Sequence, residues 1–249
     1  MQRVLDIDLD FFVFDVVFWP DQNTRPDPEE HQVWSDTDAL SFLRNRCGLQ
    51  GRRPGFVTEN HAELFPLWRA AIDRGMLVPP FHVTHVDAHA DLGLGDAGYV
   101  YLLTELLREP PEDRRYPTLG PLGLNDGNHL AFAIACRWIS DLIYVYGEGG
   151  GSDELTLVME GFERAASHVQ LATLTRQQIE RYLHRQGKPI AAHIEPAVPY
   201  QSTRWEKFLP ERPFDFVCLT RSLPYAPVTA DPLFDHIRET FIDEIDISV

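Results

Sequence analysis

The chain has 249 residues, 44% of them hydrophobic and 24% charged, which is the size and composition of a globular protein with one large domain. Its 22 basic and 38 acidic residues give a formal net charge of −16 at pH 7. Because a field of this sign repels phosphate backbones and anionic lipid surfaces, we expect no nucleic acid and no membrane among its partners.

Apolar segments and cysteines indicate the cellular compartment. The sequence contains no run of about 18 apolar residues, and its first ten residues lack the pattern of a signal peptide. Cys47, Cys136 and Cys218 are odd in number and widely spaced, which favours neither a disulfide framework nor a cysteine-based zinc site. We therefore expect a soluble, cytoplasmic protein whose thiols are buried.

Short apolar runs alternate with segments of helical period, and this pattern predicts an α/β fold with a mostly parallel sheet. The predicted strands are residues 3–12, 55–58, 82–86, 142–146, 169–174, 190–194 and 214–220. The predicted helices are residues 38–47, 63–73, 130–139, 177–185 and 232–244. Glycine follows three of these helices where a left-handed cap would lie. Because no linker interrupts this alternation, we expect a single domain over residues 1–249.

The most specific motif is His85-Val86-Asp87-Ala88-His89-Ala90-Asp91, at the end of a predicted strand. Alternate side chains of an extended chain share one side, so Asp87, His89 and Asp91 are expected to converge on one point. Carboxylates dominate this group and no thiolate joins it, which favours a hard or borderline divalent ion such as manganese over structural zinc. The alternative is a solvated strand end with scattered polar residues.

A second motif places Asp6, Asp8 and Asp10 at alternate positions of an otherwise apolar strand. Three carboxylates on one buried face repel one another unless a cation neutralises them. One alternative is a polar edge strand. Another is the aspartate pair of haloacid-dehalogenase-type phosphatases, but these continue with a small polar pair, whereas two phenylalanines follow Asp10. The chain also has only two lysines that could clamp a phosphate.

Two further groups are weak when taken alone. His61 lies in Glu59-Asn60-His61-Ala62-Glu63 after a short predicted strand, where a histidine commonly packs or caps. His129 follows the polar turn 125–128, in which an asparagine or aspartate can simply cap a helix. It also lies near the carboxyl edge of the sheet, where sites of α/β proteins are found. The histidines expected to take no part in chemistry, as isolated residues on loops or helix faces, are His31, His82, His168, His184 and His236.

Together these residues resemble the arginase and agmatinase superfamily, binuclear manganese ureohydrolases of three-layer α/β/α fold. The segment 85–91 resembles the Asp-Ala-His-x-Asp motif of that superfamily. Residues 5–12, 59–61, 125–129 and 216–222 are similar to a smaller branch that includes peptide arginases. In arginases the Asp-x-Asp strand follows the Asp-Ala-His-x-Asp strand, whereas here it comes first. The resemblance therefore implies a circularly permuted, arginase-like fold.

The resemblance also implies roles for individual residues. Two Mn²⁺ ions would be bound by ligands from three segments, namely His61, Asp87, His89, Asp91, Asp8 and Asp10. The pair Asp6 and Asp8 is the alternative to Asp8 and Asp10. In the preferred assignment, Asp6 and His85 do not bind the ions but contact and orient the residues that do. The candidate for binding the guanidinium is Glu59, with Glu148 in reserve and Asn128 as a further substrate-binding residue. His129 is the candidate proton shuttle, acting with Glu59 in catalysis.

This resemblance implies manganese-dependent hydrolysis of a guanidino group, converting arginine to ornithine and urea. Arginases grip the substrate carboxylate with polar residues directly after their motif, but Leu92-Gly93-Leu94-Gly95 offers no such donor here. We therefore expect arginine within a peptide, such as a ribosomally made precursor, as the substrate. The alternatives are the phosphatase and a metal-stabilised binding protein without turnover. A homo-oligomer is compatible with the sequence.

Overall fold

Eight strands form one sheet in the computed structural model, which describes residues 1–21, 24–151 and 153–247. Their order is β12-β4-β11-β1-β5-β6-β10-β7, and within the described residues only β7 runs antiparallel to its neighbour. The strands are β1 Arg3–Asp8, β4 Arg53–Thr58, β5 Phe81–Val86, β6 Ile139–Tyr146, β7 His168–Val169, β10 Val198–Arg204, β11 Phe216–Thr220 and β12 Ile242–Glu244. This confirms the predicted α/β class with a mostly parallel sheet.

Four short strands and six α-helices complete the described part of the chain. The short strands pair β2 Val13–Phe14 with β3 Gln32–Val33, and β8 Ala172–Thr173 with β9 His193–Ile194. The helices are α1 Asp36–Asn45, α2 Leu64–Asp73, α3 Gly98–Thr104, α4 His129–Ala135, α5 Arg176–Leu183 and α6 Asp231–Phe241. None of the helices in these described ranges is long and apolar enough to cross a membrane.

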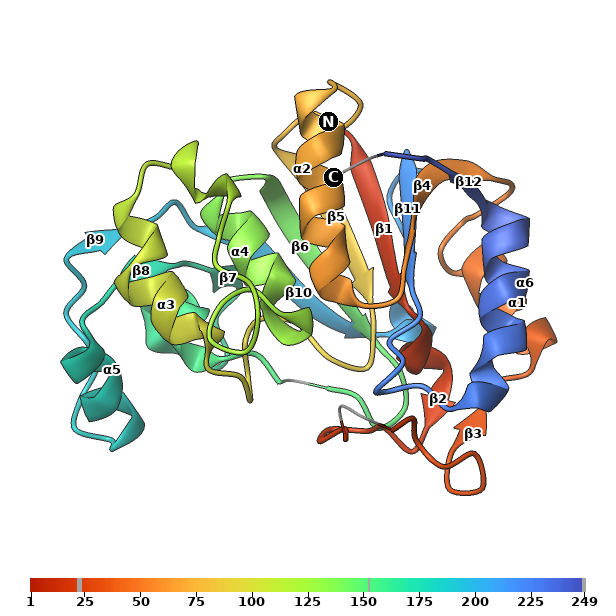
Figure 1. Cartoon of the computed structure of the whole chain (residues 1–249), viewed down its shortest axis with the longest axis horizontal. Helices are drawn as coiled ribbons and strands as arrows, with labels where there is room; N and C mark the ends of the chain where they lie inside the picture. The colour runs from red at the N-terminus through yellow and green to blue at the C-terminus, as the bar shows by residue number, and fades with distance from the viewer. Residues whose placement is uncertain (22–23, 152, 248–249) are drawn as a thin grey trace.

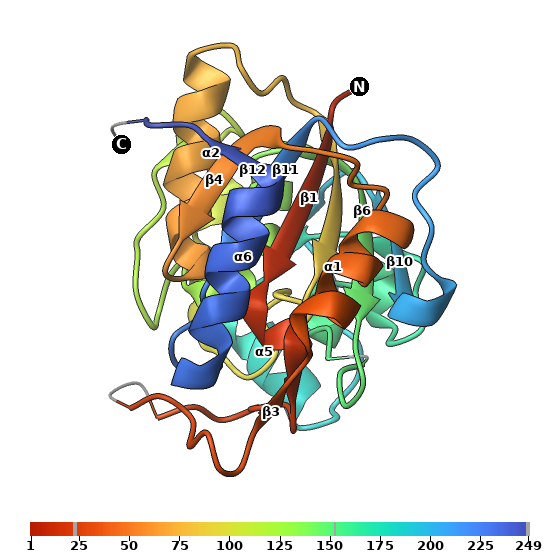
Figure 2. The same ribbon diagram turned by 90° about the vertical axis from the view of Figure 1, so that its right-hand side faces the viewer.

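The alternation of side chains along β1 explains why helices cover both faces of the sheet. Val4 belongs to the apolar cluster that includes buried residues of α2, α3 and α4. Leu5 and Ile7 point the other way and share a second cluster with α1 and α6. Figures 1 and 2 show α1 and α6 together on one face and α2 on the other. This arrangement is consistent with three α/β/α layers.

Several predicted elements differ from the structure. The predicted strand 3–12 ends at Asp8, because the side chain of Asp8 caps a 3-10 turn at Leu9–Phe12. The predicted strand 169–174 is divided between β7 and β8, and residues 190–194 contribute only β9. The predicted helix 130–139 ends at Ala135, and the sheet resumes at Ile139. Strand β10 was not predicted, since its sequence contains a proline and mostly polar, exposed side chains.

Other local predictions are confirmed. Gly48, Gly75 and Gly187 have φ angles of 70°, 69° and 103°, in the left-handed region that glycine adopts readily after a helix. The three cysteines are buried and form no disulfide.

The central strands bring the polar motifs to one edge of the sheet. β1 lies between β11 and β5, with Asp6 opposite both Cys218 and His85. Because these strands are parallel, their carboxyl ends meet at one edge, toward the bottom of Figure 1. The segments that follow β1, β4, β5 and β11 all begin there.

Candidate metal centre

The turn after β1 positions two carboxylates through one local hydrogen bond. Oδ1 of Asp8 accepts the backbone N–H of Asp10 at 2.8 Å, which ends the strand and starts the 3-10 turn. Oδ1 of Asp10 in turn accepts the backbone N–H of Ala88 at 3.3 Å. The turn after β1 is therefore tied directly to the turn after β5.

The turn after β5 is fixed by the same kind of hydrogen bond, from a backbone N–H to the carboxylate two residues earlier. Oδ1 of Asp87 accepts the backbone N–H of His89 at 2.7 Å, and Asp91 has a φ of 50°. The prediction that Asp87, His89 and Asp91 converge as alternate residues of an extended strand is therefore wrong in its geometry, since β5 ends at Val86. Their functional atoms still gather, because a hydrogen-bonded turn folds them inward.

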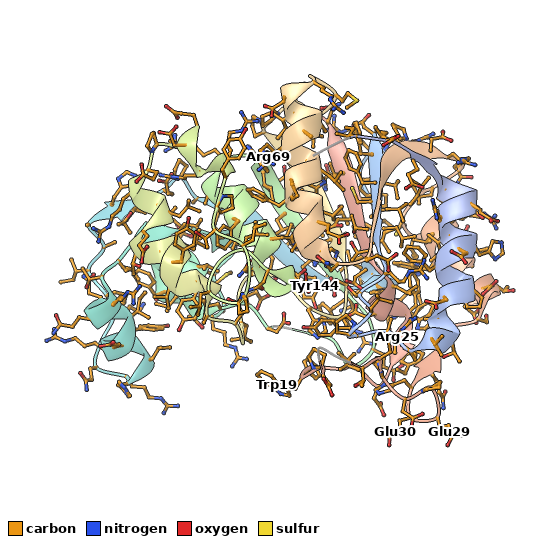
Figure 3. All side chains as sticks on the ribbon, viewed as in Figure 1. Trp19, Arg25, Glu29, Glu30, Arg69 and Tyr144 are labelled. Carbon is orange, nitrogen blue, oxygen red and sulfur yellow. The ribbon has the colours of Figure 1, made fainter. Side chains whose placement is uncertain are left out.

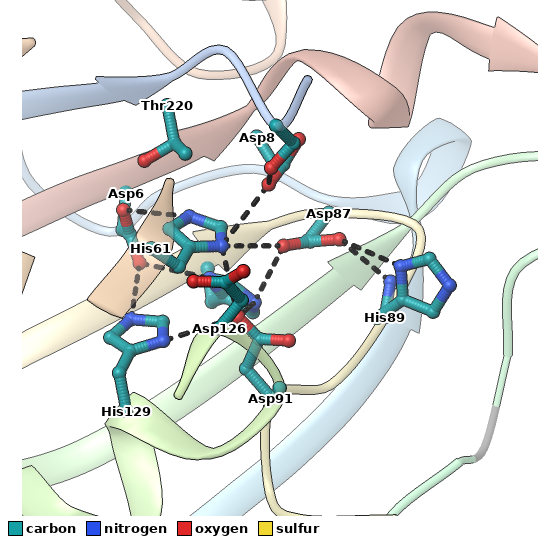
Figure 4. Close-up of polar contacts among 12 residues, drawn as sticks. Asp6, Asp8, His61, Asp87, His89, Asp91, Asp126, His129 and Thr220 are labelled. Atoms are coloured by element: carbon teal, nitrogen blue, oxygen red, sulfur yellow. Dashed lines mark hydrogen bonds and ion pairs between the residues drawn. The ribbon is translucent and has the colours of Figure 1, made fainter. Parts of the chain in front are cut away.

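His61 faces carboxylates from both turns. It opens a short 3-10 turn after β4, and its side chain is buried. Its Nδ1 atom lies 2.9 Å from Oδ2 of Asp91, 3.1 Å from Oδ2 of Asp8 and 3.4 Å from Oδ2 of Asp87. Figure 4 shows this imidazole among the carboxylates. These four side chains therefore surround one point.

His89 marks a second point on the other side of Asp87. Its Nδ1 atom lies 3.0 Å from Oδ2 of Asp10 and 3.6 Å from Oδ1 of Asp87. The two oxygens of Asp87 thus face different histidines, Oδ2 toward His61 and Oδ1 toward His89. A carboxylate in this position can bridge two cations. We call the point beside His61 the inner position and the point beside His89 the outer position.

Many buried polar atoms of this cluster have no hydrogen-bond partner. Seven such atoms are Asp6 Oδ1, His61 Nε2, His85 Nε2, Asp87 Oδ2, His89 Nε2, Asp91 Oδ2 and His129 Nδ1. Two ligand atoms that each lie about 2.1 Å from one ion, at right angles around it, are about 3.0 Å apart. Short contacts of this length without hydrogen-bond geometry fit a divalent metal site, and the oxygen and imidazole donors suit a hard or borderline ion.

The charges of the cluster also require compensation. Burial, reinforced by the charges of Asp10 and Asp87, raises the pKa of Asp8 well above its usual range. Burial and the charge of Asp87 raise the pKa of Asp10 to about 6. Burial alone would also raise the pKa of Asp87, but the adjacent His85 lowers it below its usual range. Two carboxylates therefore resist ionisation in the absence of a nearby cation.

A cavity of about 70 Å³ adjoins the outer position. It is lined by Asp8, Asp10, Phe18, His61, Asp87, His89, Asp91, Leu94, Asp126, Gly127, Asp153, Ser222 and Tyr225. All six residues predicted as metal ligands are among them, whereas Asp6 and His85 lie behind and are fully buried. The preferred pair Asp8 and Asp10 therefore faces the cavity, and the alternative with Asp6 does not.

Asp126 and Asp153 are two cavity carboxylates that sequence reasoning missed. Oδ1 of Asp126 accepts the N–H of Ala62 at 3.2 Å, and Oδ1 of Asp153 accepts that of Ala90 at 2.8 Å. Burial raises the pKa of Asp126, and burial likewise raises the pKa of Asp153 to about 7. In the sequence, the only signal for Asp126 is the polar turn before α4, and the only signal for Asp153 is its position after the glycine-rich loop.

Three residues predicted to bind substrate lie elsewhere. Glu59 is half-exposed and pairs with Arg221, Oε2 to Nε, at 3.2 Å. Glu148 is exposed and faces a separate hollow beside Glu30. Asn128 is buried and bonds to backbone groups of its own turn, with Nδ2 3.0 Å from the carbonyl of Gly123. These three predictions are corrected, because Glu59 turns to Arg221, Glu148 lies outside the cavity, and Asn128 is used by its own turn.

Two histidine assignments also change. His129 is fully buried and does not line the cavity, so it is not placed to exchange a proton with a leaving group as predicted. His82 is not isolated, since it is buried in β5 and lies 2.9 Å from the Arg3 guanidinium and close to Asp141. It contacts none of the candidate metal ligands in the described structure.

Comparison with protein families, with curated proteins and with solved structures finds no match. Functional inference therefore rests on the geometry of the cluster and on the resemblance of its motifs.

Proposed function

We propose that the protein is a hydrolase with two divalent metal ions, manganese in the first instance, that cleaves the guanidino group of arginine within a peptide to give ornithine and urea. The observation that carries this proposal is the convergence of six predicted ligands from three separate segments on one cavity, with buried donor atoms that lack hydrogen-bond partners. Two such ions supply a nucleophilic water at neutral pH by lowering its pKa toward about 7.

The protein's own residues explain how a guanidinium would bind. Asp126 and Asp153 line the cavity without being among the candidate ligand groups, and each has one oxygen fixed by a backbone N–H. Fixed carboxylates hold a planar guanidinium by charge-assisted hydrogen bonds. In this proposal Asp126 and Asp153 bind the guanidinium, which is the role predicted from the sequence for Glu59 and Glu148. Positioning the guanidinium carbon beside the outer position is the main requirement, because this carbon is a poor electrophile.

The rim of the cavity favours a peptide over the free amino acid. Phe18 and Leu94 line the mouth with 49% and 53% of their surfaces exposed, and Trp19 is 81% exposed against Gly95. Figure 3 shows Trp19 standing away from the ribbon at the lower edge of the molecule. Among the described lining residues there is no arginine, lysine or asparagine to hold an α-carboxylate. Apolar groups flanking the arginine would cover this rim.

We propose further that the chain is a permuted relative of the arginase and agmatinase superfamily. The aspartate strand β1 and the strand β5, which Asp87 directly follows, are parallel neighbours. Their carboxyl ends therefore deliver ligands to one centre although their order along the chain is reversed. A permutation that preserves the positions of strands preserves the site.

The phosphatase alternative receives no support from the cavity. A phosphate clamp needs cationic side chains, and none of the described lining residues is a lysine or an arginine. The following experiment distinguishes the proposed hydrolase from a metal-stabilised binding protein without turnover.

The test compares urea release from a blocked arginyl peptide and from free arginine, at equal concentration, by the Mn²⁺-loaded protein. We expect faster release from the peptide, and we expect Asp91→Ala to lose activity and metal together. Faster release from free arginine would refute the peptide preference. No urea from either substrate, with two ions bound, would instead favour the binding protein.

A further inference from the structure

Three buried histidines, His61, His85 and His129, aim one ring nitrogen each at the inner position. We infer that this position is a three-histidine metal site whose imidazoles are oriented by Asp6, and that it differs in kind from the outer position. The inference rests on the metal centre of the proposed function but not on the reaction that the centre performs.

His85 presents its Nε2 atom to the inner position. This atom lies 3.1 Å from Oδ2 of Asp87 and 3.9 Å from Oδ2 of Asp91, without a hydrogen bond to either. The other ring nitrogen, Nδ1, is hydrogen-bonded to Oδ2 of Asp6 at 3.0 Å. An ionised carboxylate only accepts hydrogen bonds, so Nδ1 carries a proton, and a metal ion at the inner position would take the place of any proton on Nε2.

His129 has the same arrangement with its two nitrogens exchanged. Nε2 is hydrogen-bonded to Oδ2 of Asp6 at 3.3 Å, and Nδ1 lies 3.1 Å from Oδ2 of Asp91 without a hydrogen bond. Both unpartnered nitrogens therefore face carboxylate oxygens. A nitrogen lone pair and a carboxylate oxygen at this distance repel each other unless a proton or a metal cation lies between them. An ordinary buried histidine would have a donor or acceptor matched to each nitrogen.

Asp6 acts through these imidazoles rather than as a ligand. One oxygen, Oδ2, accepts from both His85 and His129, and the other, Oδ1, lies 3.6 Å from Nε2 of His61. All four side chains are almost completely shielded from solvent. A carboxylate behind a metal-binding imidazole fixes its tautomer and orientation. Asp6 is therefore a positioning residue.

The two positions consequently offer different donors. Around the inner position, Asp91 shares one group of candidate ligands with His61 and His129 and another with His85 and Asp87, whereas the outer position has His89 with Asp10 and Asp87. Imidazole donors favour the later transition ions, and carboxylates favour Mg²⁺ and Mn²⁺. The inner position should hold its ion more tightly and prefer Co²⁺ or Zn²⁺ over Mn²⁺, while the outer position exchanges with Mn²⁺.

The test measures metal content, not activity. Metal-free protein is incubated with Co²⁺ and Mn²⁺ together, freed of unbound ions, and analysed by elemental mass spectrometry. We expect one tightly held cobalt in the wild-type protein, lost in His85→Ala and His129→Ala but kept in His89→Ala. Asp6→Asn should weaken the inner position by about 10- to 100-fold. His82→Gln, which changes a buried histidine of the same strand outside the cluster, should keep both ions.

Retention of both ions by His85→Ala and His129→Ala would overturn the inference. If either variant does not fold, as judged by circular dichroism, X-ray absorption of wild-type protein carrying a single equivalent of Zn²⁺ decides the question. Three imidazole ligands are expected, and a single one would refute the site. These experiments measure metal binding and not urea release. A protein that binds its metals as described but hydrolyses nothing would therefore refute only the proposed function.

Discussion

Replacing Asp153 by asparagine tests how the cavity binds its cation. The substitution keeps the shape of the side chain and leaves a carbonyl oxygen that can accept the N–H of Ala90, as Oδ1 does now at 2.8 Å. It removes the negative charge that Asp153 presents to the cavity. A hydrogen bond to a charged group contributes about 1.5–3 kcal/mol. Since each 1.4 kcal/mol or so is tenfold, kcat/KM for an arginyl peptide should fall by roughly 10- to 150-fold.

The matched control is Glu148→Gln, which removes a carboxylate from the glycine-rich loop just before Asp153 but outside the cavity. Initial rates of urea release at low peptide concentration give kcat/KM for both variants, and metal content is measured in parallel. We expect Glu148→Gln to behave as wild type and Asp153→Asn to retain its metals. Unchanged kcat/KM in Asp153→Asn, or a loss confined to Glu148→Gln, would refute the assignment of the guanidinium-binding carboxylate.

Three further predictions concern stability and the cavity rim. Divalent ions at about 100 times their dissociation constant should raise the unfolding midpoint of chelated protein by roughly 5–10 °C, and a midpoint indifferent to metal would argue against any metal centre. A Cβ at Gly55 would lie 1.7 Å from the carbonyl oxygen of Val217, so Gly55→Ala should lower the free energy of unfolding by about 3 kcal/mol in urea titrations; unchanged stability would contradict the close pairing of β4 and β11. Phe18→Ala should lower kcat/KM for peptides roughly fivefold, because burying the exposed half of the ring contributes about 1 kcal/mol, and equal rates would remove the rim from substrate binding.

The sequence predicted the fold where apolar periodicity is strong. Strands β1, β5 and β11 are buried along their whole length and β6 at every other residue or so, and their apolar runs were recognisable. Strand β10 has only Val198 and Tyr200 buried, so its pattern resembles that of a loop. The end of β1 at Asp8 depends on a side-chain hydrogen bond to Asp10, which composition does not reveal.

The site was predictable as far as spacing and chemistry determine it. Alternating carboxylates and histidines at strand ends indicated the ligands, and these side chains do gather at one cavity. Which carboxylates complete the cavity depends on how loops fold over the sheet edge. Glu59 is next to this edge in sequence, but its side chain turns to Arg221, whereas Asp126 and Asp153 come from distant loops. Local sequence carries little information about such long-range contacts.

Hydrolysis of a guanidino group within a peptide is the reaction that we propose for the metal centre. The most direct measurement is the mass spectrum of a blocked peptide containing one arginine, recorded after incubation with the metal-loaded protein. We predict that the peptide loses the mass of CN₂H₂, as arginine becomes ornithine and urea is released, and that the same peptide with lysine in place of arginine stays unchanged. An arginyl peptide of unaltered mass, with two ions bound to the protein, would contradict the proposed reaction.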